Sequence, residues 1–406
     1  MNICAVICEF NPLQNGHQLI LEKARELSSC DFVLCIMSGN FTQRGEEAIV
    51  DKFVRAKIAM LCGADMVVHN PTPFSTSSSE IFSLSSVKIA NSFENVTHLC
   101  FGSECGDIDA LKKCAKFFAN EPKEYSSLLK KYLQLGNSFN QSRTLALDEY
   151  SKTNQDAKEY SSLLQSPNNI LAVEYIKALI LTKSKIEPLT IKRENNFNSK
   201  DLTKFASSTA IRNELYNSKK LSKCKDLMPK KAYSTLNEYF KTHNMPKKET
   251  LSDIVLYSIR TSPLSEIKNT FDVKEGLENR IKDVAKNSTN IEEYFEKVAT
   301  KRYQAAKLRR IATHLLLGIK EEDVLSIYKY KTLPYIKVLA ANKRILSSNI
   351  RCNTNLIVRN CETKNLPKNA KRLIEIEDRT EQVYSLLTGK TTTIPYLLQT
   401  SIIISF

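Results

Sequence analysis

The turn after the first apolar run carries side chains suited to binding a phosphate. It reads Glu9-Phe10-Asn11-Pro12-Leu13-Gln14-Asn15-Gly16-His17. Asn-Pro imposes an extended turn, Gly16 lets the backbone approach a ligand closely, and His17 stands at the start of the next helical pattern. Helix-start N–H groups attract phosphate, and an imidazole there can donate to an α-phosphate as charge builds in a transition state. Taken alone, an Asn-Gly-His turn is more often only a turn.

A second candidate phosphate-binding group lies much further along the chain. Lys192 and Arg193 end a strand-like run, and Ser207-Ser208-Thr209 precede Arg212. Ser or Thr at a helix N-cap normally satisfies backbone N–H groups, and this role alone would explain Ser207 and Ser208. Three consecutive hydroxyls followed by an arginine are better explained as a cradle for β- and γ-phosphates.

Short apolar runs alternate with helical patterns in the first hundred residues. The runs are Ile3–Cys8, Phe32–Met37, Met66–Val68 and Val96–Phe101, and the helical patterns lie near Gln18–Ser28, Lys52–Cys62 and Glu80–Asn91. A further run, Ile186–Ile191, follows a helical stretch that ends near Leu181. This alternation predicts a Rossmann-like α/β domain with a parallel sheet. Ligands of such sheets bind beyond the carboxyl ends of the strands, where the first turn lies.

The later part of the chain reads differently. Beyond Leu202 no convincing series of strands is present, and helical periodicity dominates, as in the stripe Leu308, Ile311, Ala312 and Leu315. We therefore expect an α/β domain over residues 1–216 and a mostly α-helical region over residues 217–406.

The charge of the chain is unevenly distributed. Residues 1–100 carry 7 Lys and Arg against 10 Asp and Glu, whereas residues 201–406 carry 37 against 22. A basic half favours a polyanion partner, because neutralising phosphates releases counterions. The alternative is that lysine serves only as a surface residue in a chain from an AT-rich genome.

Membrane insertion and secretion are not indicated. No apolar run approaches the roughly 20 residues that span a bilayer, and the first ten residues read as a strand rather than a secretory signal. We expect a cytoplasmic protein whose scattered cysteines are reduced.

The phosphate-binding groups together resemble the HxGH nucleotidyltransferase superfamily, in which a Gly-His turn and a Ser-Ser-Thr-x-x-Arg helix start bind ATP from two sides. More specifically, the chain resembles the bacterial tRNA(Met) cytidine acetate ligase family. The likeness includes, in order, Ser38–Glu46, Lys52–Ala56, Gly63–Asp65, Ser79–Phe82, Phe101–Glu104, Ser166–Leu171 and Ile191–Arg193. It is thinner later, at Lys301–Tyr303 and Leu315–Ile319.

The resemblance implies an adenylate-forming ligase. Acetate attacks the α-phosphorus of ATP, pyrophosphate leaves, and the acetyl group passes to N4 of the wobble cytidine of elongator tRNA(Met). His17, Lys192 and Arg193 would be catalytic, and Mg²⁺ would arrive with ATP rather than on a dedicated set of ligands. The implied ATP-binding residues are Ile7, Cys8, Glu9, Phe10, Asn11, Pro12, Leu13, Gln14, Asn15, Gly16, His17, Gln18, Leu19, Ile20, Gly102, Asn168, Lys192, Arg193, Ser207, Ser208 and Thr209.

The loop after the second strand is a candidate substrate pocket. Asn40, Gln43 and Arg44 should face the same crevice, where Arg44 could grip acetate. The alternative is a solvated loop held by side-chain turns. We expect Lys52 and Arg55 to lie on the solvent face of a helix that begins near Asp51, outside the site.

Three segments depart from the family pattern. Gln14 replaces the first motif histidine, and glutamine can donate a hydrogen bond but cannot bring a positive charge to phosphate. His69-Asn70-Pro71 replaces Glu-Leu-Pro, and a lone histidine in a turn is more often structural. The segment Glu194–Asp201 lacks the family's Gly-Tyr-His-Asp stretch, so the role of that loop is in doubt.

Two other functions remain open from the sequence. A small-molecule adenylyltransferase would use the same turn, although such enzymes usually lack a long basic helical region. A non-catalytic RNA-binding relative would retain the fold without the chemistry, and Gln14 keeps this alternative open. The sequence does not indicate the oligomeric state.

Overall fold

The structure is a computed structural model that describes residues 1–193, 206–363, 366–390 and 394–405. The segment Glu194–Asp201 lies outside the described residues.

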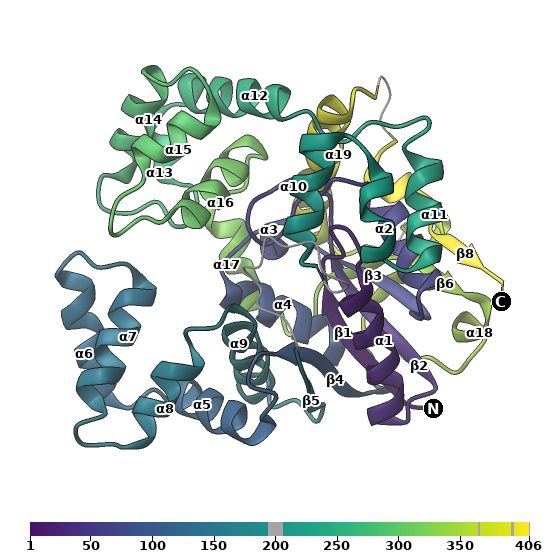
Figure 1. Ribbon diagram of the computed structural model, residues 1–406, viewed down its shortest axis with the longest axis horizontal. Coiled ribbons are helices and arrows are strands. Elements are labelled where there is room, and N and C mark those ends of the chain that lie inside the picture. The colour runs from purple at the N-terminus through teal and green to yellow at the C-terminus, as the bar shows by residue number, and fades with distance from the viewer. Residues whose placement is uncertain (194–205, 364–365, 391–393, 406) are drawn as a thin grey trace.

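Among the described residues, a single sheet of eight strands organises the molecule (Figure 1). Its order is β5-β4-β1-β2-β3-β6-β7, and β8 also pairs with β6. β1 is parallel to β2 and β4, β2 to β3, and β4 to β5, which confirms the expected parallel α/β sheet. The strands are β1 (Ile3–Cys8), β2 (Phe32–Ser38), β3 (Met66–Asn70), β4 (Val96–Ser103), β5 (Glu187–Lys192), β6 (Tyr335–Asn342), β7 (Asn355–Ile357) and β8 (Ile402–Ile404).

The expectation of no strand beyond Leu202 is wrong. β6 pairs antiparallel with β3, with Met66 opposite Ala341 and Val68 opposite Val338, and all eight of its residues are buried. Such a strand reads as one short apolar run, which periodicity cannot distinguish from a segment of buried helix. The region after residue 216 is mainly helical, but it also completes the sheet. Its separation as a domain at Tyr216 stays a prediction.

Helices cover both faces of the sheet. Alternate strand residues sort between the faces: Cys4, Val6 and Cys8 of β1 pack toward one helical layer, and Ile3 and Ala5 toward the other. The first layer contains α1 (Asn15–Ser28), α2 (Lys52–Leu61), α10 (Ser208–Ser218) and α11 (Lys230–Tyr239). The second contains α3 (Thr72–Ser75), α4 (Ser79–Asn91), α5 (Ile108–Asn120), α9 (Pro167–Leu181), α17 (Glu321–Lys329) and α19 (Ala370–Thr388).

Two groups of helices extend from this body (Figure 1). The first is α6 (Lys123–Gln134), α7 (Phe139–Tyr150) and α8 (Asp156–Leu163). The second, with its own apolar core, is α12 (Lys248–Thr261), α13 (Leu264–Lys268), α14 (Leu277–Lys286), α15 (Ile291–Val298) and α16 (Ala305–Leu316). The short helices are α18 (Lys343–Leu346), η1 (Leu221–Leu227), η2 (Asn360–Thr363) and η3 (Tyr396–Leu398). Within the described ranges, no helix is both long and apolar enough to cross a membrane.

Candidate nucleotide-binding and catalytic site

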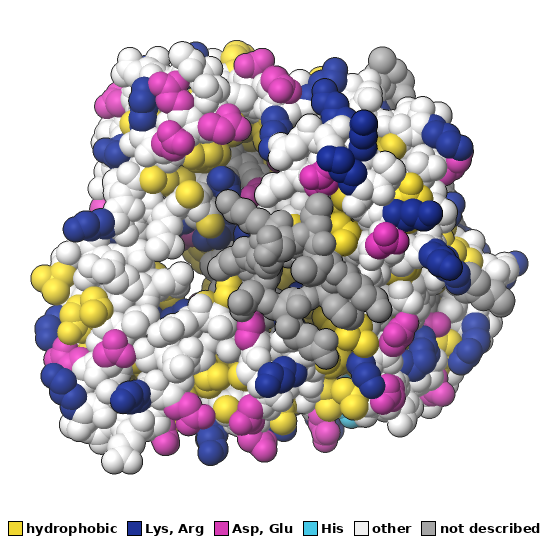
Figure 2. All heavy atoms as spheres, in the orientation of Figure 1, with side chains coloured by type: hydrophobic (Ala, Val, Ile, Leu, Met, Phe, Trp, Pro, Cys, Tyr) yellow, Lys and Arg dark blue, Asp and Glu magenta, His cyan; other side chains and the backbone are white. Residues whose placement is uncertain are grey.

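A cavity of about 1080 Å³ lies at the carboxyl ends of β1 and β4. The space-filling view shows this face of the molecule hollowed, with Lys and Arg side chains inside the hollow (Figure 2). The first loop and the Ser-Ser-Thr helix start both line the cavity, as do the helical groups around α7 and α16. The predicted residues that line it are Ile7, Cys8, Glu9, Phe10, Asn11, Gln14, His17, Ile20, Gln43, Arg44, Gly102, Asn168, Arg193, Ser207, Ser208 and Thr209.

Hydrogen bonds fasten the start of α10 to the first loop. The Ser208 hydroxyl donates to the Pro12 carbonyl at 3.1 Å, and the Arg212 guanidinium donates to the Asn11 carbonyl at 2.9 Å. The Ser207 hydroxyl accepts from the Ala210 N–H at 3.1 Å and therefore caps the helix. These contacts bring the two distant motifs to one cavity. Contact of these hydroxyls with phosphate stays a prediction.

His17 is a neutral hydrogen-bond donor in this cavity. Burial, assisted by the charge of Arg193, lowers the pKa of His17 to about 3. The Gln14 N–H donates to Nδ1 of His17 at 3.3 Å, so the proton of the neutral ring is on Nε2. The Gln14 side chain is itself occupied, since its Oε1 accepts from the Gly16 N–H at 2.5 Å. Gln14 thus orders the turn that presents Nε2–H of His17.

Arg193 enters the cavity beside Gly102 and Asn168. Its Nη1 donates to Oδ1 of Asn168 at 3.2 Å, and a Cβ at Gly102 would lie 3.1 Å from Cγ of Arg193. The Glu104 carboxylate accepts from the backbone N–H groups of Asn168 and Asn169 at 3.1 and 2.8 Å, which fixes the start of α9. Glycine at position 102 therefore leaves room for the arginine.

Lys192, the residue before Arg193, does not line the cavity. Its side chain is exposed, and it is absent from the described cavity lining. Successive side chains of a strand point to opposite faces, so only one of two consecutive basic residues can face the cavity. Of the two, only Arg193 lines the cavity, and contact of either residue with the triphosphate stays a prediction.

Some residues of the loop after β2 line the cavity, and others are buried in the protein interior. The Gln43 N–H donates to Oε1 of Glu9 at 2.7 Å, and its side chain donates to the Ser77 carbonyl at 2.9 Å. Gln43 and Arg44 line the cavity, whereas Asn40 is fully buried and does not. The assignment of Asn40 to the substrate pocket is therefore corrected: its amide bonds to Glu381 instead.

Lys52 and Arg55 are buried, contrary to the prediction of a solvent face. Arg55 donates to the carbonyls of Val50, Glu9 and Ser38 at 2.9, 2.6 and 3.2 Å, and also to that of Gly39. It thereby joins the ends of β1 and β2. The spacing of Lys52, Arg55 and Ala59 places all three on one face of a helix. That face is buried in the structure, and the charge of its two basic residues hides this in the sequence.

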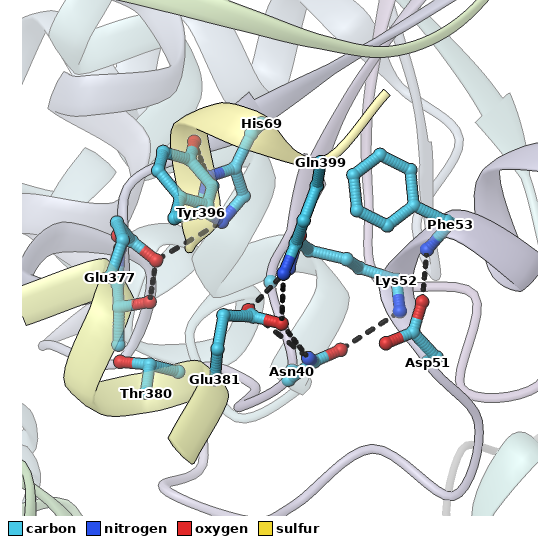
Figure 3. A network of polar contacts seen from close by, with 12 residues as sticks. Asn40, Asp51, Lys52, Phe53, His69, Glu377, Thr380, Glu381, Tyr396 and Gln399 are labelled. Carbon is cyan, nitrogen blue, oxygen red and sulfur yellow. Dashed lines mark hydrogen bonds and ion pairs between the residues drawn. The ribbon is translucent and has the colours of Figure 1, made fainter. Parts of the chain in front are cut away.

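Lys52 belongs to a buried polar network (Figure 3). Its ammonium group pairs with the Glu381 carboxylate of α19, and its backbone N–H donates to Oδ1 of Asn40 at 2.8 Å. Gln399 donates to Glu381 at 3.0 Å. Nearby, Nδ1 of His69 lies 2.7 Å from the Tyr396 hydroxyl, so His69 is a structural residue rather than a base facing the cavity.

The described cysteines are free thiols, and the described residues contain no group of three His, Cys, Asp or Glu side chains that would hold a metal.

Comparisons with known proteins place this geometry in a family. A model of the HIGH Nucleotidyl Transferase family matches residues 1–395. The tRNA(Met) cytidine acetate ligase of Clostridium novyi is 40% identical over 344 residues, covering 84% of this chain and 85% of its own. That of Clostridium perfringens is 37% identical over 395 residues, covering 95% and 96%.

The chain belongs to the tRNA(Met) cytidine acetate ligase family.

Solved structures agree with this assignment to the tRNA(Met) cytidine acetate ligase family. Thermotoga maritima TmcAL in its apo form I matches with a TM-score of 0.91 and 28% identity, over 100% of both chains. The same protein bound with alpha-thio ATP matches with a TM-score of 0.89 and 27% identity, also over 100% of both chains. The expected resemblance and nucleotidyltransferase fold are confirmed.

The cavity of this tRNA(Met) cytidine acetate ligase family member also has lining residues that the sequence did not predict. Around α16 it carries Arg302, Tyr303 and Lys307, and around α7 it carries Phe139 and Arg143. Lys307 lies 5.4 Å from the centre of the Tyr303 ring, and the Phe139 side chain is 55% exposed. Aromatic and basic side chains from segments with no recognisable motif can only be grouped once the fold is known.

The two basic residues after β5 should differ in function. We expect Arg193→Ala to raise the KM for ATP by about 10- to 100-fold, since a hydrogen bond to a charged group contributes roughly 1.5–3 kcal/mol. Lys192→Ala should change it by less than about twofold, as exposed substitutions usually do. Initial rates of ATP–pyrophosphate exchange at varied ATP measure both. Equal losses would contradict the opposite orientations of the two side chains.

Proposed function

We propose that the chain is an ATP-dependent ligase that activates acetate as acetyl-adenylate and transfers the acetyl group to N4 of the wobble cytidine of elongator tRNA(Met). One observation carries the proposal most directly. His17, Arg193 and the Ser-Ser-Thr helix start, which lie far apart in the chain, line one cavity in a chain 37% identical over 95% of its length to a tRNA(Met) cytidine acetate ligase.

In the first step an acetate oxygen attacks the α-phosphorus of ATP and pyrophosphate leaves. Nε2–H of His17 donates to a non-bridging oxygen of the α-phosphate, where negative charge increases in the transition state. Arg193, held toward the cavity by Asn168, offsets charge on the departing pyrophosphate. Arg44, which lines the cavity, is our candidate for the acetate carboxylate. Mg²⁺ would be carried by the ATP phosphates, in keeping with its preference for phosphate and water oxygens.

In the second step the cytidine must enter the same cavity. A wobble base is unpaired with its own chain and can be splayed out to stack on an aromatic ring. Phe139 and Tyr303 present rings in the cavity, and Arg302 and Lys307 bring positive charge for the RNA backbone. Residues 217–406 supply α16 and most of the positive charge, so we propose them as the main tRNA-binding region. Because tRNA is the proposed substrate, we also propose a cytoplasmic location.

The two alternatives are less well supported. The curated relatives are named as ligases, which does not favour a small-molecule adenylyltransferase. Gln14 does not indicate loss of chemistry, because it holds the turn around His17 through Gly16.

The test is acetylation of a defined RNA. Purified protein, ATP, radiolabelled acetate and a transcript of elongator tRNA(Met) should yield N4-acetylcytidine at the wobble position, detected by nucleoside mass spectrometry. Omission of ATP, or a transcript with uridine at the wobble position, should abolish the product. No product with authentic tRNA would refute the proposal, and a dinucleotide product without RNA would favour the small-molecule alternative.

A further inference from the structure

One carboxylate of the cavity lining has no ion-pair partner among the described residues. The described lining includes Glu9, Glu46, Glu80, Glu174, Asp272 and Glu275. Each of the last five is in an ion pair with a lysine or an arginine. Glu46 pairs with Arg212 at 3.3 Å and Arg309 at 3.1 Å, and Glu80 and Glu174 pair with Lys177 at 3.6 and 3.3 Å. Asp272 pairs with Lys307 at 3.3 Å, and Glu275 pairs with Arg302. Within the described part of the chain, Glu9 stands apart.

Glu9 is held in place by its neighbours on both sides. It follows β1 directly, its Oε1 accepts from the Gln43 N–H at 2.7 Å, and Arg55 binds its backbone carbonyl at 2.6 Å. Gln43 therefore engages one carboxylate oxygen, and Glu9 lines the cavity. The site thus contains a fixed proton acceptor eight residues before His17 in the sequence.

The proposed acetyl transfer needs such an acceptor. The exocyclic amine of cytidine is conjugated with its ring, so its nitrogen becomes a good nucleophile only as a proton leaves. His17 does not supply this function, because Nδ1 is occupied by the Gln14 N–H and Nε2 already carries the proton. The other lining carboxylates are engaged with lysine or arginine.

We propose that Glu9 is the general base of the transfer step, which rests on the proposed function. The N4 nitrogen attacks the acetyl carbonyl carbon, and the new N–C bond forms as the bond from that carbon to the AMP oxygen breaks. AMP leaves with the electron pair of the broken bond. The N4 proton passes to the free oxygen of Glu9.

The charged surroundings of Glu9 allow this role. Burial raises the pKa of Glu9, which makes its carboxylate a stronger base, while the charges of Arg212, Arg55 and Arg44 oppose that rise. Tyr175 and the Cys8 thiol also lie near this carboxylate, and their own pKa values are raised by burial, so both stay protonated at neutral pH. We expect the charge of Glu9 to govern the acidic limb of the transfer rate. Burial also raises the pKa of Glu174 in the same cavity lining, so that residue needs its own variant.

Glu9→Gln tests the assignment, because the amide oxygen can still accept from the Gln43 N–H. We measure acetate-dependent ATP–pyrophosphate exchange and, in single turnovers, acetyl transfer from preformed acetyl-adenylate to tRNA. The ratio of transfer to exchange should fall by about 10²- to 10⁴-fold, the range of general base catalysis. Glu9→Asp should recover part of that loss, and the acidic limb of the wild-type transfer profile should vanish in Glu9→Gln.

The matched control is Glu174→Gln, which changes another carboxylate of the cavity lining that is already in an ion pair with Lys177. It should leave the ratio of transfer to exchange unchanged. An unchanged ratio in Glu9→Gln would overturn the assignment, whether neither rate falls or both fall equally, provided that the variant has a normal unfolding temperature. Absence of acetate-dependent exchange in the wild-type protein would refute the proposed function itself, which separates the two failures.

Discussion

The His17→Ala protein should exchange pyrophosphate into ATP about 10²- to 10³-fold more slowly than the wild-type protein, as expected for loss of one preorganised donor to a developing oxyanion. The loss should appear mainly in kcat, because the α-phosphate gains charge in the transition state rather than on binding. Lys23→Ala provides the control on the same helix. The ammonium group of Lys23 pairs with Glu26 at 2.7 Å, and Lys23 does not line the cavity.

The neutral state of His17 gives this prediction a second readout. With a pKa of about 3, the free enzyme's imidazole is uncharged throughout the neutral range. The kcat/KM for ATP should therefore show no His17-dependent decline between about pH 6 and pH 8. A histidine acting as a cation would lose activity as pH rises through roughly 6.5, its ordinary pKa. Such a decline, absent in His17→Ala, would contradict the neutral donor.

The sequence was sufficient to predict the elements that carry the phosphate-binding groups. β1 is a contiguous apolar run and β2 is one up to its last residue, and the turn at Gly16 and the Ser207 cap depend on residues only a few positions away. Local patterns of this kind reveal both the element and its end. The meeting of His17 with Ser208 followed from the general rule that parallel strands place ligands at their carboxyl ends.

The buried charges could not be predicted in the same way. The partner of Lys52 is Glu381, 329 residues further along the chain, and no feature near Lys52 indicates it. A lysine at the start of a helix is typical of a solvated position, although this ammonium group pairs with Glu381 and lies 5.0 and 5.5 Å from the centres of the Phe53 and Tyr396 rings. β6 also depends on a distant partner, because only its pairing with β3 identifies it as a strand.

Removal of the negative charge at position 381 should destabilise the protein by about 3–5 kcal/mol, the usual cost of leaving one partner of a buried ion pair unpaired. Lys52 is fully buried, and Lys337 lies close enough that burial together with the Lys52 charge lowers the pKa of Lys337 to about 8. Glu381→Gln keeps an oxygen acceptor for Asn40 and Gln399 but leaves Lys52 without its counterion. Urea unfolding should detect the change as a lower midpoint.

Glu377, one turn earlier on α19, should not replace the lost charge. Burial raises the pKa of Glu377 to about 7, so this carboxyl is partly protonated at neutral pH, and Thr72 already donates to both of its oxygens, at 2.6 and 2.8 Å. The stability lost in Glu381→Gln should therefore not return through a rearrangement within α19.

A double variant separates the orphaned charge from any loss of packing. Lys52→Met combined with Glu381→Gln removes both charges and keeps the volume of both side chains, so it should be more stable than Glu381→Gln alone. Glu238→Gln is the exposed comparison, since the side chains of Lys241 and Glu238 are 61% and 74% exposed, and it should cause no measurable loss. If the double and single variants unfolded at the same urea concentration, the cost would not come from Lys52. The ion pair would then not be what stabilises the contact between α19 and the start of α2.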